Sequence, residues 1–158
     1  MRRLITIGLI LCGALLAAAT AGASAKPVVP RTVQLRMLHT TPALAYAPTR
    51  MALGFHYVSW QKSPSNLEVT FDNKAGWEIR FVALRTSGSC RTGMEKSFQL
   101  DGNKVYWSHT GAEQQAWRCV TGPQGRQLRL VASSPQPPTL FADVGLGRVV
   151  ASGKRIVS

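Results

Sequence analysis

Apolar and polar residues alternate most regularly between positions 67 and 84. In 67–73 the apolar residues occupy every second position, and 77–84 repeats the pattern after a three-residue gap. This period of two is typical of strands with one buried face, so the two segments are predicted to form a β-hairpin. Gly76 stands where a three-residue turn needs a left-handed residue. The shared apolar face sets two cross-strand pairs, Phe71 with Ile79 and Val69 with Phe81.

Further strands are predicted on both sides of this hairpin. Residues 54–60 are dense in aromatic and β-branched side chains, which favours a strand. Later strands are predicted to turn at Gly102-Asn103, in a loop at 109–115 and at 121–126. The pairs that follow are Leu100–Val105, Phe98–Trp107, Trp107–Trp117, Val105–Cys119, Cys119–Leu128 and Trp117–Leu130. These eight residues are therefore expected to share one continuous apolar face.

The segments outside these strands are predicted to be less regular. Residues 26–50 contain four prolines and form a Pro-containing N-terminal arm, in which 33–37 alternates briefly like an edge strand. Residues 139–151 carry apolar positions that favour a helix docked on the sheet, whereas the β-branched residues of 148–150 favour a further strand. Residues 152–158 are predicted to be a frayed basic tail.

The whole pattern predicts one disulfide-linked β-rich domain over 51–151. We expect an α+β fold: a curved antiparallel meander of about six strands with the C-terminal helix packed on it. An all-β sandwich is the alternative.

The first 25 residues have the three parts of a secretory signal peptide. A basic start precedes an apolar run at 4–19 and a small-residue cleavage site at 23–25. The only two cysteines beyond this segment, Cys90 and Cys119, are predicted to form a disulfide, which persists in an oxidising compartment. We therefore expect a secreted or extracytoplasmic protein, in the periplasm or the cell-wall space, with no transmembrane segment after signal cleavage.

Basic residues greatly outnumber acidic ones. Removal of Arg2 and Arg3 with the signal peptide leaves 17 of the 19 basic residues against 7 acidic ones, a net charge of +10. Such a charge predicts attraction to anionic partners, which outside a bacterial cell include phosphate-rich wall polymers and lipid headgroups. The basic residues are scattered along the chain and form no stripe, so no specific nucleic-acid binding is expected.

Candidate chemistry is sparse. The three histidines, His39, His56 and His109, lack the spacing of metal ligands, so neither a metal nor a cofactor is expected. His109 follows Ser108 and precedes Glu113, a combination that would suit acid/base chemistry in a small hydrolase or nuclease. Strand parity also assigns one set of aromatic and basic residues to the solvent-facing side of the sheet. This predicted binding face consists of Trp60, Arg80, Tyr106, Arg118 and Arg129.

Three segments carry a resemblance to a known group of domains: GFHYVSW at 54–60, LDGNKVYW at 100–107, and Trp117-Arg118. They resemble bacterial extracytoplasmic domains of unknown function that occur on anti-sigma regulators and are related to lipoprotein-carrier-like folds. The resemblance covers 51–151 and implies a curved antiparallel sheet with a packed helix. It also implies binding of partners or lipids, with no shared catalytic residues. The cysteine pair and the positive charge lie outside the pattern.

These observations leave three functional hypotheses. The first is a secreted non-enzymatic domain that binds an anionic cell-envelope component or a protein partner. The second is a small secreted basic hydrolase or nuclease that uses His109 and a carboxylate. The third is a lipid-binding, carrier-like domain with a pocket lined by Phe55, Phe71 and Trp77. No motif in the sequence specifies the ligand.

Overall fold

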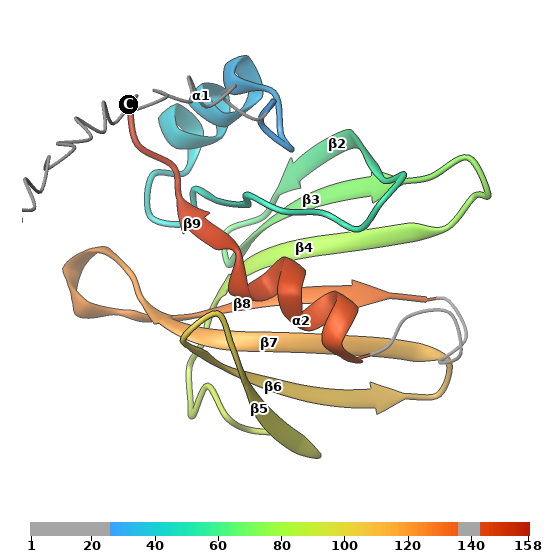
Figure 1. Cartoon of the computed structure of the whole chain (residues 1–158). Coiled ribbons are helices and arrows are strands. Elements are labelled where there is room, and N and C mark those ends of the chain that lie inside the picture. Colours follow the sequence, from blue (N-terminus) through green and yellow to red (C-terminus); the bar gives the residue numbers. More distant parts are fainter. Residues whose placement is uncertain (1–25, 136–142) are drawn as a thin grey trace, which may run out of the picture.

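The computed structural model describes residues 26–135 and 143–158 (Figure 1). Within these residues the fold is mostly antiparallel sheet with two α-helices, in agreement with the α+β prediction. The large sheet contains β2 (His56–Lys62), β3 (Asn66–Asp72), β4 (Glu78–Arg85), β5 (Lys96–Leu100), β6 (Asn103–Thr110), β7 (Glu113–Thr121) and β8 (Gln127–Ser134). The other elements are α1 (Arg31–Thr40), β1 (Tyr46–Pro48), the short 3₁₀ helix η1 (Pro123–Gly125), α2 (Asp143–Ala151) and β9 (Gly153–Arg155). The predicted signal peptide lies outside the described residues.

The seven strands follow the order β2-β3-β4-β8-β7-β6-β5. After β4 the chain passes to the far edge of the sheet, and it then returns through β5, β6 and β7 to β8, which pairs with β4. The prediction of about six strands in a simple meander was therefore wrong in strand number and in strand order. Hairpin signals report only local pairs, so they could not reveal the pairing of β4 with β8.

The β3–β4 hairpin has the predicted register. Phe71 lies opposite Ile79 and Val69 lies opposite Phe81. Gly76 has a φ of +77°, the left-handed conformation that the turn requires. The alternating pattern predicted this register correctly, because one face of these strands is buried and the other is only half-buried.

Around β7 the predicted pairing was wrong by one residue. Tyr106, not Trp107, lies opposite Trp117, and Cys119 lies opposite Arg129. A one-residue shift moves every side chain to the other face, so Trp117 and Cys119 leave the predicted apolar face. The physical reason is that both faces of β7 are covered, and apolar residues therefore occur on both.

The β5–β6 hairpin also has a different turn from the predicted one. The two turn residues are Asp101 and Gly102, with φ values of 49° and 74°, and Phe98 consequently lies opposite Val105. This shift of two residues preserves the faces, so Phe98 and Val105 remain on the core side of the sheet. Asp101 therefore takes the place in the turn that was predicted for Asn103.

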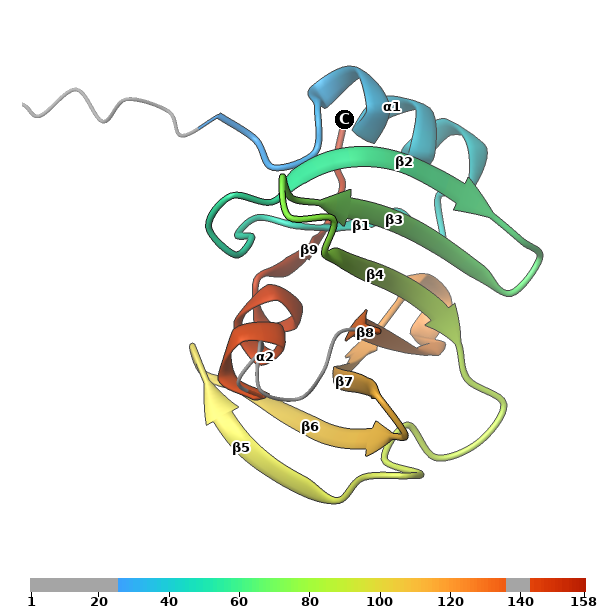
Figure 2. The same cartoon turned by 90° about the vertical axis from the view of Figure 1, so that its right-hand side faces the viewer.

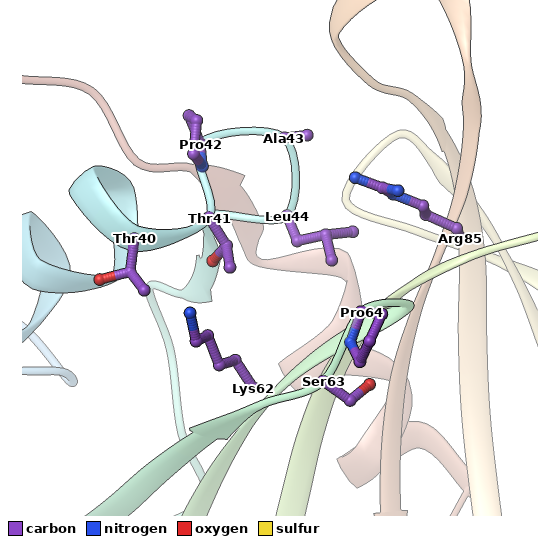
Figure 3. Close-up of a pocket in the computed structure, with 9 residues that line it drawn as sticks. All are labelled: Thr40, Thr41, Pro42, Ala43, Leu44, Lys62, Ser63, Pro64 and Arg85. Carbon is purple, nitrogen blue, oxygen red and sulfur yellow. The ribbon is translucent and has the colours of Figure 1, made fainter.

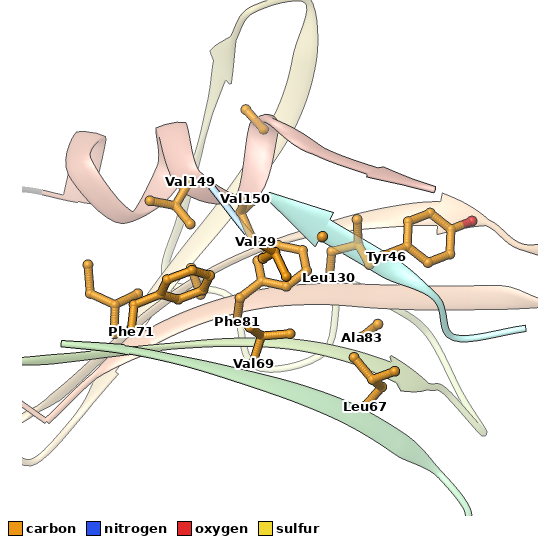
Figure 4. Packing of buried hydrophobic residues seen from close by; sticks show 14 of the residues in the cluster. Val29, Tyr46, Leu67, Val69, Phe71, Phe81, Ala83, Leu130, Val149 and Val150 are labelled. Atoms are coloured by element: carbon orange, nitrogen blue, oxygen red, sulfur yellow. The ribbon is translucent and has the colours of Figure 1, made fainter. Parts of the chain in front are cut away.

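The large sheet bends around α2 (Figure 2). The main core lies on this concave side. Side chains of β3, β4 and β8 meet those of α2 and β1 there (Figure 4). The predicted C-terminal helix is present as α2, and it packs on β6, β7 and β8. The predicted start of that helix, 139–142, lies outside the described residues.

Both termini of the described chain belong to the core, contrary to prediction. The predicted edge strand at 33–37 lies within α1, and Val29 and Met37 are fully buried. The supposed basic tail contains β9, which pairs with β1, and buries Ile156. The prolines of 26–50 and the basic residues of 152–158 led to the prediction of an arm and a frayed tail. Each segment is nevertheless ordered, because a few buried side chains suffice to anchor it.

Candidate functional site

The structure divides the five residues of the predicted binding face between the two sides of the sheet. Arg80, Tyr106 and Arg129 lie on the convex side. Tyr106 does not face solvent there, contrary to prediction, because it is buried in the apolar cluster around Cys90. Trp60 lies opposite Val69 and packs against the main core, and Arg118 lies opposite Leu130 on the same concave side. A bulge in β2 and the shifted register of β7 explain the two errors.

On the convex side the connection 86–95 closes over the sheet. Its Cys90 forms the predicted disulfide with Cys119, and Cys90 packs with Tyr106, Trp117 and Val131 in a second apolar cluster. The indole Nε1 of Trp117 donates a hydrogen bond to the carbonyl oxygen of Cys90 at 2.9 Å. The cluster, the disulfide and this hydrogen bond together hold the connection 86–95 against the convex face.

The arginines of the convex face are engaged within the protein. Arg129 donates to the carbonyl oxygens of Cys90 and Thr92 at 2.8 and 2.9 Å, and burial lowers the pKa of its guanidinium. Arg80 forms ion pairs with Glu78 at 3.2 Å and with Glu113 at 3.4 Å. Both guanidinium groups are therefore already partly occupied by groups of the protein.

Arg118 holds separate elements together on the concave side. Its guanidinium donates to Oδ1 of Asn103 and to the carbonyl oxygen of Gly153. Burial lowers the pKa of Arg118. Its contacts join β7 to β6 and to β9, so Arg118 fixes the relative positions of these three strands.

His109 pairs with a different carboxylate from the expected one. Its Nδ1 lies 2.9 Å from Oε2 of Glu95, while Glu113 is bound to Arg80. Among the described residues, no three His, Cys, Asp or Glu side chains form a group that could hold a metal ion. The proposed hydrolase chemistry at His109 stays a prediction, with Glu95 as the adjacent carboxylate.

Phe55, Phe71 and Trp77, the residues of the suggested lipid pocket, contribute to the main core. Phe71 is fully buried, Phe55 is nearly so, and the partly buried Trp77 packs against the same cluster. The lipid-carrier hypothesis stays a prediction.

Three exposed cations gather at one end of the large sheet, and we call Lys62, Arg85 and Arg126 the strand-end surface. Lys62 ends β2, Arg85 ends β4, and Arg126 directly precedes β8. The pairing brings these ends together, because Arg85 lies opposite Leu128 and its backbone N–H donates to the carbonyl oxygen of Ser65 in the β2–β3 turn.

Two open cavities adjoin at the strand-end surface. The first, of about 450 Å³, lies between the loop that follows α1 and the β2–β3 hairpin, and Lys62 and Arg85 extend into it (Figure 3). The second, of about 470 Å³, is lined by Arg85 and Arg126. Among the residues that the structure describes, no acidic side chain lines either cavity. Over the described ranges, no member of the strand-end surface forms an ion pair, so all three cations are available to an anionic ligand.

Sequence reasoning missed this surface because it looked for basic residues that are neighbours along the chain. The three cations belong to separate hairpins and meet only through the strand pairing. A signal does exist, since each cation stands beside a turn sequence: Lys62 before Ser63-Pro64, Arg85 before Thr86-Ser87, and Arg126 after Gly125.

In the described part of the chain, neither helix has the length and apolar character needed to cross a membrane. Comparison of the chain with protein-family models, with curated proteins and with solved structures found no match.

Proposed function

We propose that this protein is an exported, non-enzymatic interaction domain that binds an anionic polymer of the cell envelope. The observation that carries the proposal is the strand-end surface, where three cations that form no ion pair with any described residue line two adjoining open cavities. The convex face is a weaker candidate, because Arg80 and Arg129 are already bound to groups of the protein.

The overall charge supports the same partner class. Residues 26–158 carry a net charge of +10, which draws anionic molecules toward the protein from a distance. At the surface, contact requires cations that are not neutralised locally, and Lys62, Arg85 and Arg126 meet that requirement. Binding of a polyanion to such a surface releases counterions, so affinity should fall steeply with added salt.

The test is to measure the binding of inorganic polyphosphate to the purified protein and to two charge-matched triple variants. Lys62→Ala/Arg85→Ala/Arg126→Ala removes the strand-end surface. The control, Lys74→Ala/Lys104→Ala/Lys154→Ala, removes three exposed cations from other parts of the chain.

We expect the first variant to lose at least tenfold in affinity and the control to lose less than threefold. Equal losses in the two variants would show that only net charge matters, and the proposal would then be wrong. Circular dichroism and thermal melting of both variants check that each is folded.

A further inference from the structure

We infer that the strand-end surface recognises a polymer of polyol phosphate units, in which phosphate groups alternate with hydroxylated aliphatic carbons. This inference rests on the proposed function and adds the chemical class of the polymer. It follows from three features of the cavities besides their charge: oriented threonine hydroxyls, an apolar wall and a shared arginine.

The threonine hydroxyls are oriented as acceptors. Thr40 and Thr41 line the first cavity, and their hydroxyls donate to the carbonyl oxygens of Arg36 and Met37 at 2.7 and 3.2 Å. In the second cavity the hydroxyl of Thr86 donates to the carbonyl oxygen of Gln127 at 3.3 Å. The hydroxyl proton of each threonine is thus used in a hydrogen bond to the backbone. The hydroxyl oxygen can still accept a hydrogen bond from a ligand.

A fully ionised phosphate has no proton to give to these oxygens. A ligand hydroxyl can donate to a threonine oxygen, while Lys62, Arg85 and Arg126 donate to the phosphate oxygens. Threonines and basic residues are both among the residues that line each cavity. The donor and acceptor set therefore matches a ligand that carries hydroxyl and phosphate groups close together.

The first cavity also has an apolar wall. Pro42, Leu44 and Pro64 line it beside the two threonines (Figure 3). Such a wall favours contact with carbon-bound hydrogen atoms, which a polyol backbone supplies and inorganic polyphosphate lacks. This contact gives a second, independent reason for preferring a polyol phosphate.

Arg85 lines both cavities, which places two anion sites side by side. A polymer with repeated phosphates can occupy both at once, and the second contact then forms at high effective concentration. A single phosphorylated unit can fill only one cavity. We therefore expect the polymer to bind much more tightly than its monomer.

The experiment compares soluble poly(glycerol phosphate), inorganic polyphosphate of matched phosphate number, and monomeric glycerol phosphate as ligands of the purified protein. We expect the poly(glycerol phosphate) to bind at least tenfold more tightly than either of the other two. The triple variant Thr40→Val/Thr41→Val/Thr86→Val keeps the β-branched shape and removes the acceptors. Its preference for poly(glycerol phosphate) over polyphosphate should shrink to the part that the apolar wall supplies, at most about threefold. The control Thr110→Val, which changes an exposed threonine that lines neither cavity, should keep the full preference.

Equal affinity of the unaltered protein for both polymers would overturn the polyol assignment and leave the proposed function standing. Failure of both polymers to bind would overturn the proposed function as well. An unchanged preference in the valine variant would show that the threonines do not recognise the hydroxyl groups of the polymer. If that variant does not fold, the single change at the exposed Thr40 replaces it. Tighter binding to phosphatidylglycerol vesicles than to the soluble polymer, at equal phosphate, would assign the surface to lipid headgroups and refute the polymer.

Discussion

At the scale of single residues, the pair of Glu95 and His109 shows how a backbone group tunes an exposed carboxylate. The backbone N–H of His109 donates to Oε1 of Glu95 at 2.9 Å, and the imidazole Nδ1 lies 2.9 Å from Oε2. The pKa of Glu95 is lowered, chiefly because the backbone N–H of His109 favours the ionised form. A carboxyl whose pKa is lower in the folded protein stabilises the fold above its ordinary pKa, and that stabilisation is lost as pH falls through the folded-state value.

The variant Glu95→Gln tests this contribution. At neutral pH the variant should have a lower free energy of unfolding than the unaltered protein, because an amide is a weaker acceptor than a carboxylate. The difference should shrink as pH falls below the ordinary glutamate pKa of about 4.3 and vanish in stronger acid. Urea unfolding at a series of pH values measures it, and a difference that does not change with pH would contradict the assignment.

At the scale of elements, the docking of α2 depends on one of its two glycines. A Cβ atom on Gly147 would lie 2.7 Å from Cδ1 of Leu100 and 2.9 Å from Cε2 of Phe98. A Cβ atom on Gly145 would meet no atom of the described residues within 4 Å. Gly147 therefore lets the helix approach β5 closely, whereas Gly145 only lowers the helix propensity.

Alanine substitutions should consequently act in opposite directions at these two positions. Gly145→Ala should raise the free energy of unfolding by up to about 1 kcal/mol through helix propensity. Gly147→Ala should lower it by up to about 2 kcal/mol, which is the overpacking cost of about 1–3 kcal/mol less the propensity gain of about 1 kcal/mol. Chemical denaturation of both variants measures the two changes, and stabilisation by Gly147→Ala would show that Phe98 and Leu100 move aside.

At the scale of the whole molecule, the connection 86–95 determines the arrangement of the sheet. It leads from β4 to β5 past three intervening strands, and the disulfide at Cys90 anchors it to β7. Further contacts join its backbone to Trp117, Arg129 and Trp107. The two halves of the sheet are thus joined by the β4–β8 ladder on one side and by this cross-linked connection on the other.

Removal of the cross-link should therefore destabilise the whole fold. The two cysteines are 29 residues apart, and closing a loop of that length stabilises a protein by about 3–4 kcal/mol in the chain-entropy model. We expect the double variant Cys90→Ser/Cys119→Ser to lose a similar amount in urea unfolding. The unaltered protein should show the same loss in reductant. A loss below about 1 kcal/mol would mean that packing alone holds the connection in place.

Much of the local structure was accessible from the chain alone. Alternation over 67–84 sufficed to establish a hairpin and its register, because one face of those strands is buried and the other is not. The cysteine pair was accessible by elimination, and the helical spacing before the C-terminus correctly indicated α2. The hairpin and the helix follow from the spacing of apolar residues over a short stretch of chain. The disulfide follows from the number of cysteines beyond the signal peptide.

Long-range packing decided the rest. Trp117 and Cys119 face the convex side because a distant connection covers it, and a strand buried on both faces has no alternation that reveals its orientation. The ends of the described chain join the core through contacts with each other, which neither segment signals locally. Lys62, Arg85 and Arg126 form one surface only after β4 pairs with β8. Local periodicity specifies an element, whereas the neighbours and covering layers of that element depend on contacts between residues far apart in the chain.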